Sequence, residues 1–151
     1  ACSLKMGALV GNANTTDASL LYEFGINLGL AFQLQDDFLD VYGDVEKFGK
    51  NIGGDILCNK KTFLLISAFN VADDSTRKEL EKWLTIPDAN PQEKIKAVTD
   101  IYNRLNIKQI CQEEMDCYYQ KALHALRSVS CPEQRKEVLQ NYASRLMQRE
   151  S

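Results

Sequence analysis

The sequence predicts an all-α protein, and three observations carry that prediction. Apolar residues recur at intervals of three and four along most of the chain, which is the period of an amphipathic helix. Alternating apolar and polar runs, which indicate half-buried strands, are nearly absent. The 151 residues contain only three prolines, and they stand at breaks in the helical pattern. Repeats and linkers are also absent, so we expect residues 1–151 to form one domain.

The helical pattern is present from the first residue. Because a natural chain begins with methionine and Ala1 already lies in this pattern, we expect a fragment of a longer polypeptide. A long second helix is predicted from Asp17, as its N-cap, to Gly43, where it stops. Gly25 and Gly29 lie on one face of that helix, so they would let a neighbouring helix approach closely.

A polar stretch with several glycines, Asp44–Asn59, interrupts the helices and is predicted to be a long loop, a kind of segment that is often functional. Asp73 fits an N-cap role, and Pro91 suits the first turn of a helix. The remaining helices are predicted at about Lys60–Val71, Ser75–Leu84, Pro91–Asn106, Ile107–Val129 and Glu133–Arg149.

The composition limits which cellular compartment and which binding partners we expect. With 18 basic and 21 acidic side chains the net charge is −3, which gives no reason to expect nucleic-acid binding. Five cysteines without a C-x-x-C pair favour a reducing cytoplasm over a disulfide framework. Nothing in the sequence resembles a signal peptide, and no apolar run approaches the roughly 20 residues that span a bilayer.

Three carboxylates cluster near the end of the long helix. At about 100° per residue, Asp36, Asp37 and Asp40 point in directions of about 0°, 100° and 40°, which lie in one sector. Their mutual repulsion is relieved when a cation binds. Oxygen ligands without histidine or cysteine suit a hard ion such as Mg²⁺, which commonly takes one or two carboxylates plus substrate phosphates.

A bare D-D-x-x-D pattern also fits a solvated acidic face. Large apolar residues and two glutamines, Gln33 and Gln35, frame the aspartates and favour a helix that faces a core. An EF-hand is excluded, because Phe38 and Tyr42 occupy positions that would need oxygen ligands.

A basic, glycine-bearing segment comes after the aspartates. It contains Gly49–Lys50, Gly53–Asp55 and Asn59–Lys61. Glycines permit close approach of the backbone, and lysines supply the point charges that a diphosphate needs. The order is not that of a Walker loop. Carboxylates together with this segment predict a site that holds Mg²⁺ and a diphosphate between them.

These motifs resemble those of the trans-isoprenyl diphosphate synthases, the polyprenyl synthetase family. Gly29–Asp44 is similar to the second aspartate-rich motif of the family, and Gly49–Lys50, Gly54–Ile56 and Asn59–Thr62 match the segment downstream of that motif. Upstream, Leu4–Leu9 resembles the Lys-Thr motif. The resemblance is strong over residues 4–64 and continues in the helix pattern beyond them. It implies the C-terminal part of the isoprenoid-synthase helical bundle.

The resemblance also implies roles for the aspartates and for one glutamine. Asp36 would hold Mg²⁺, the expected cofactor, and through it the allylic diphosphate. Asp37 and Asp40 would do so less directly. Gln33 would lie beside the reacting allylic carbon.

Three lysines, Lys5, Lys50 and Lys60, would contact the diphosphate and offset charge on the leaving group. Of these, Lys5 and Lys50 join Gln33 as the expected catalytic residues. Met6 replaces the customary threonine of the Lys-Thr motif, so one hydroxyl contact to the leaving group is missing.

The implied activity is prenyl transfer in isoprenoid biosynthesis, in which isopentenyl diphosphate condenses with an allylic diphosphate. The family uses two facing aspartate-rich motifs and this chain carries one, so we expect no activity from it alone. A homodimer is implied by the family. Two alternatives stay open, a non-catalytic regulatory subunit and a class I terpene cyclase-like protein.

Overall fold

The computed structural model describes residues 1–44 and 52–148, and over these ranges it contains helices and no strand. The all-α prediction is therefore confirmed. The described residues divide into two compact units, the first made of residues 1–35 and 114–148 and the second of residues 36–44 and 52–113. Helices α2 (Thr15–Tyr42) and α8 (Ile107–Arg127) contribute residues to both units.

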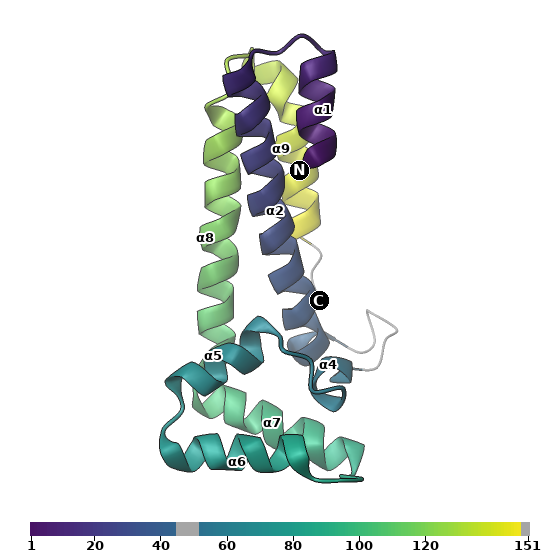
Figure 1. Ribbon diagram of the computed structural model, residues 1–151, viewed down its shortest axis with the longest axis vertical. Helices are drawn as coiled ribbons and strands as arrows, with labels where there is room; N and C mark the ends of the chain where they lie inside the picture. Colours follow the sequence, from purple (N-terminus) through teal and green to yellow (C-terminus); the bar gives the residue numbers. More distant parts are fainter. Residues whose placement is uncertain (45–51, 149–151) are drawn as a thin grey trace. The chain divides into compact units, whose positions relative to one another are not determined.

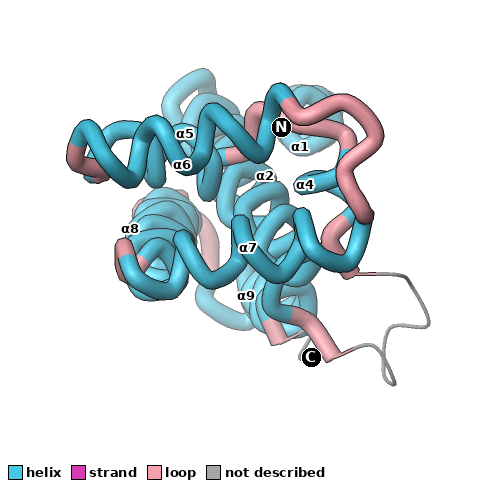
Figure 2. The backbone as a smooth tube through the Cα atoms, turned by 90° about the horizontal axis from the view of Figure 1, so that it is seen from below, coloured by secondary structure: helices cyan, strands magenta, loops and turns pink. Residues whose placement is uncertain are grey.

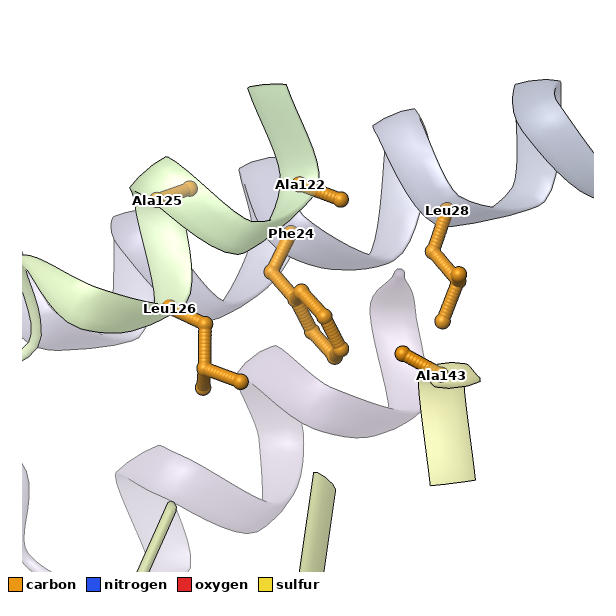
Figure 3. Packing of buried hydrophobic residues seen from close by; sticks show 6 residues of the cluster. All are labelled: Phe24, Leu28, Ala122, Ala125, Leu126 and Ala143. Atoms are coloured by element: carbon orange, nitrogen blue, oxygen red, sulfur yellow. The ribbon is translucent and has the colours of Figure 1, made fainter. Parts of the chain in front are cut away.

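The first unit is a bundle of long helices. It contains α1 (Cys2–Val10), α9 (Glu133–Met147) and the adjoining parts of α2 and α8, which run alongside one another in Figure 1. Helices α2, α8 and α9 enclose a cluster of side chains that are at most 7% exposed. Figure 3 shows these residues: Phe24, Leu28, Ala122, Ala125, Leu126 and Ala143. Burying a side chain as large as Phe24 contributes roughly 1.5–3 kcal/mol, so this cluster is the stabilising centre of the unit.

A glycine of α2 allows α1 to pack closely. A Cβ atom added to Gly25 would lie 2.6 Å from the Cα of Ala1, a distance that side chains do not tolerate. The predicted close approach is therefore confirmed at Gly25. It is not found at Gly29, where nothing among the described residues lies within 4 Å of such a Cβ.

A buried aspartate joins the start of α2 to the segment after α8. Asp17 was predicted to be the N-cap, and that prediction is wrong, because α2 already begins at Thr15 and the Asn14 side chain accepts the Asp17 N–H. The Asp17 carboxylate instead accepts the backbone N–H and the hydroxyl of Ser130, both at 2.9 Å. These bonds, the backbone one first, lower the pKa of Asp17 below its usual 3.8.

The second unit consists of shorter helices, seen in Figure 2. These are α4 (Gly54–Leu57), α5 (Phe63–Val71), α6 (Asp74–Thr85) and α7 (Pro91–Arg104). Helix α7 packs against the other three. The buried apolar side chains of these helices are Ile56, Leu64, Leu65, Ala68, Leu80, Val98, Ile101 and Tyr102. The core of this unit therefore centres on α7.

The helix starts in this unit confirm two predictions and correct one. Asp73 caps α6, since its carboxylate accepts the Thr76 N–H at 2.7 Å. Pro91 is the first residue of α7. Helix α5 was predicted to begin at Lys60 and instead begins at Phe63. The buried Thr62 hydroxyl accepts the Leu65 N–H and thereby fixes this start.

The prediction of a loop over residues 44–59 is wrong at Gly54–Leu57, which form α4. Residues 45–51 of that segment lie outside the described residues. Among the described residues, no helix combines the length and the apolar character needed to cross a membrane.

Candidate functional site

The three aspartates at the end of α2 have different surroundings. Asp36 is exposed, Asp37 is only 6% exposed and Asp40 is partly buried. Within the described residues, no group of three or more Asp, Glu, His or Cys side chains is arranged to hold a metal ion. Asp37 and Asp40 instead accept hydrogen bonds from the Lys60 ammonium and from the backbone N–H of Asp55. Asp36 is therefore the carboxylate of this motif that faces solvent.

Lys60 forms ion pairs with residues of both α2 and α4. Its ammonium lies 2.9 Å from Oδ1 of Asp37 and 2.7 Å from Oδ2 of Asp55. The hydrogen bonds to Asp55 and then to Asp37 raise the pKa of Lys60 well above its usual 10.5, so the lysine carries its charge throughout the physiological range. About half of the Lys60 side chain is exposed, so a solvent-borne anion has access to it.

Asp40 of α2 holds the start of α4 by two hydrogen bonds. Its carboxylate accepts the backbone N–H of Asp55 at 2.9 Å, and its carbonyl accepts the N–H of Gly53 at 2.6 Å. Burial raises the pKa of Asp40 above 3.8, and the Asp55 N–H opposes that change. These two hydrogen bonds hold Asp55 beside the end of α2.

A glycine makes this junction possible. Gly53 has φ +87°, in the left-handed region that residues with a Cβ avoid. A Cβ at this position would also lie 2.7 Å from side-chain atoms of Ile95 on α7. Glycine at residue 53 therefore lets the backbone turn into α4 and pack against α7 without strain.

The turn that ends α4 directs Lys60. The N–H of Lys60 bonds to the carbonyl of Asp55 at 2.9 Å, and the N–H of Asn59 bonds to the carbonyl of Ile56 at 3.2 Å. Asn59 is left-handed with φ +51°. This pair of bonds around a left-handed residue is a Schellman motif, a common way to end a helix. Lys60 is the first residue after the turn, and its ammonium bonds to the side chain of Asp55 on α4.

These residues line a pocket within the second unit. Its walls come from α2, α4, the turn after α4, and α5, α6 and α7. The lining residues are Val41, Asp55, Ile56, Asn59, Lys60, Thr62, Leu65, Leu84, Val98 and Tyr102. Burial raises the pKa of Tyr102, so its hydroxyl remains protonated.

The balance of charge favours a cation. The site contains four carboxylates, those of Asp36, Asp37, Asp40 and Asp55, and the ammonium of Lys60 pairs with two of them, Asp37 and Asp55. Oxygen donors of this kind suit a hard divalent ion, which needs only one or two of them together with water and phosphate oxygens. The exposed carboxylate of Asp36 meets that requirement without disturbing the pair between Asp37 and Lys60.

Two of the other site residues expected from the sequence, Gln33 and Lys5, belong to the first unit. Gln33 is exposed on α2, one helical turn before Asp36. Lys5 is partly buried on α1 in the first unit, with its ammonium 5.4 Å from the centre of the Tyr22 ring. Lys50 lies outside the described residues.

Sequence reasoning missed two members of this arrangement. Asp55 was noted only as part of a motif, although it accepts both the backbone N–H and the ammonium of Lys60. Asn59 was likewise noted without a role. The available signal was the spacing of a short polar segment that ends in Asn-Lys, which fits a left-handed helix end.

Comparison with known proteins identifies relatives of the chain. Residues 1–102 match the family model described as polyprenyl synthetase. The geranylgeranyl diphosphate synthase of Sulfolobus acidocaldarius is 33% identical over 128 residues, which are 85% of this chain and 38% of that protein.

Solved structures agree with these matches. A crystal structure of a geranylgeranyl pyrophosphate synthase has a TM-score of 0.87 and 35% identity over 99% of this chain and 47% of its own. A geranylgeranyl pyrophosphate synthase from Corynebacterium glutamicum, complexed with isoprenyl diphosphate and magnesium, has a TM-score of 0.81 and 25% identity, over 95% of this chain and 40% of its own. The chain spans less than half the length of each of these three relatives.

Proposed function

Since the chain belongs to the polyprenyl synthetase family, we propose that it serves a trans-prenyltransferase of isoprenoid biosynthesis, which condenses isopentenyl diphosphate with an allylic diphosphate. Its part is to hold the allylic diphosphate at the second aspartate-rich motif. The observation that carries this proposal is the shared ammonium of Lys60, 2.9 Å from Asp37 and 2.7 Å from Asp55, together with the exposed carboxylate of Asp36, which directly precedes Asp37 in the sequence.

Magnesium fits this donor set. Asp36 would hold it directly, and Asp37 and Asp40 would contribute less directly, because they already accept hydrogen bonds from Lys60 and from the N–H of Asp55. When bound, magnesium neutralises diphosphate charge and stabilises the leaving group. The Corynebacterium relative that was crystallised with isoprenyl diphosphate and magnesium supports this assignment.

The residues of the chain supply the remaining electrostatics. Lys60 keeps its charge and is half exposed, so it would pair with the diphosphate and stabilise negative charge as the carbon–oxygen bond breaks. Lys5 and Lys50 would add further contacts to the same group. The amide of Gln33 would lie beside the allylic carbon.

We also infer that residues 1–151 belong to one polyprenyl synthetase domain, that the protein acts in the cytoplasm and that it forms a homodimer. The similarity to a single solved chain over 99% of this one supports the first inference. Five cysteines without a C-x-x-C pair support the second. A group of exposed apolar side chains on α1, those of Met6, Leu9 and Val10, supports the third. Sedimentation analysis of the purified chain tests the dimer.

Two measurements on the purified 151-residue chain test the proposed function. Titration calorimetry with inorganic pyrophosphate should show binding that requires Mg²⁺. An elongation assay with labelled isopentenyl diphosphate and an allylic diphosphate should give no product, because the chain carries one of the two aspartate-rich motifs. Absence of magnesium-dependent pyrophosphate binding contradicts the proposed site, and turnover by the chain alone contradicts its proposed share of the reaction.

A further inference from the structure

A buried lysine of α7 lies behind the turn that presents Lys60. Lys94 is only 7% exposed. Its ammonium donates to the side-chain oxygen of Asn59 at 2.6 Å and to the carbonyl of Leu57 at 3.4 Å. The first contact is a short, charge-assisted hydrogen bond, which is among the stronger polar contacts in proteins.

The two acceptors belong to the Schellman turn. Leu57 is the last residue of α4, and Asn59 is the left-handed residue that reverses the chain. The Asn59 side chain also donates to the carbonyl of Leu84 at the end of α6. Lys94 and Leu84 therefore hold the Asn59 amide from two sides, and residue 60 comes directly after it.

Two features of the position of Lys94 are energetically unfavourable, its burial and its place near the start of a helix. Lysines are almost never fully buried without a partner of opposite charge, and within the described residues no carboxylate forms an ion pair with this one. Lys94 is also the fourth residue of α7, where the positive end of the helix dipole disfavours a cation. Local rules that are broken together in this way are expected at functional sites.

We propose that Lys94 is a positioning residue for Lys60: through the Asn59 amide it fixes the turn that directs the Lys60 ammonium toward the diphosphate. This inference rests on the proposed function, because it takes Lys60 to be a diphosphate ligand. Lys94 itself touches neither the metal nor the diphosphate. Its effect passes entirely through the geometry of residues 57–60.

The test is a double-mutant cycle, read by calorimetric binding of magnesium pyrophosphate to the full 151-residue chain. We expect Lys94→Met to weaken binding about tenfold, the size of one lost charge-assisted hydrogen bond. The second variant, Asn59→Gly, keeps the left-handed turn and removes the amide, so it should cause a similar loss. Lys96→Met, an exposed lysine on the same helix, controls for net charge. Circular dichroism and thermal melts establish that each variant is folded.

The decisive result is the behaviour of Lys94→Met in a chain that already carries Lys60→Met. If Lys94 acts through Lys60, its substitution should change pyrophosphate binding there by less than twofold. A full tenfold loss in that background means that Lys94 acts by another route and overturns the inference. So does a Lys94→Met chain that binds as tightly as the wild type. If the wild-type chain itself fails to bind magnesium pyrophosphate, the proposed function fails first and the inference falls with it.

Discussion

The ammonium of Lys60 lies 2.9 Å from the carboxylate of Asp37, a residue 23 positions earlier in the chain. The contact joins a nearly buried carboxylate to a lysine that is about half exposed. It makes Lys60 both a structural counter-ion and a group that an anion from solvent can reach. The two roles are separable by experiment.

Replacing Lys60 tests both roles at once. Lys60→Met should weaken magnesium-dependent pyrophosphate binding to a level that calorimetry still measures, because the half-exposed ammonium is lost while the exposed carboxylate of Asp36 remains. It should also lower the free energy of unfolding by roughly 1–2 kcal/mol, because buried Asp37 loses its cation while solvent moderates the effect. Calorimetry and urea denaturation measure the two effects. Lys61→Met, an exposed neighbour, should change neither, and wild-type binding by the Lys60 variant would contradict the assignment.

Asp36 should matter for metal binding and not for stability. Its carboxylate is exposed, so Asp36→Asn leaves the folded state intact while removing a negatively charged oxygen donor. We expect magnesium affinity, measured in the presence of pyrophosphate, to fall at least about tenfold, with the melting temperature unchanged. The matched control is Asp100→Asn on α7, which is also exposed. Equal affinity in the two variants would remove Asp36 from the metal site.

Two glycines should respond to alanine in opposite ways. Gly53→Ala places a Cβ in a left-handed residue and against Ile95, so we expect a loss of roughly 1–3 kcal/mol in unfolding free energy together with weaker pyrophosphate binding. Gly29→Ala lies within α2, where no atom of the described residues comes within 4 Å of an added Cβ, and should stabilise the chain by about 0.5–1 kcal/mol. Denaturant titrations of both variants decide whether the left-handed turn or helix propensity governs each site.

Asp17 should contribute to acid stability. Its pKa is lowered in the folded state by the N–H and hydroxyl of Ser130. The carboxylate therefore stabilises the fold at pH values above its unfolded pKa, and this contribution is lost as the pH falls through and below about 3.8, the usual value. Asp17→Asn should reduce stability at neutral pH and flatten its dependence on pH below 4. Thermal melts from pH 2 to 7 measure this, and identical slopes in variant and wild type would contradict it.

Much of the fold can be predicted from local sequence patterns. The long helix was predicted because its apolar residues keep the helical period, and Phe24 and Leu28 of that pattern lie in the core. Asp73 and Pro91 were assigned correctly because a cap and a first-turn proline act within four residues of themselves. The family resemblance supplied the expectation that three aspartates and Lys60 share a site.

The parts that were not predicted depend on contacts between distant residues. Helix α5 begins at Phe63, later than expected, because the N–H of Lys60 serves the Schellman turn and Thr62 caps the helix. Lys94 reads as an ordinary surface lysine of an amphipathic helix, since its partner Asn59 is 35 residues away. The apolar period of a sequence predicts which face of a helix is buried, but it does not predict which polar group from a distant segment contacts that face.

The Schellman turn also limits how this segment can vary. Because Lys60 bonds back to Asp55 by both its backbone and its side chain, residues 55–60 behave as a module of fixed length. One residue inserted into α4 would rotate the downstream residues by about 100° around the helix axis and carry the lysine away from Asp37. Point substitutions at its exposed positions, such as Cys58, leave that length untouched. Engineering of this site should therefore keep the number of residues between Asp55 and Lys60 and vary only the side chains at exposed positions.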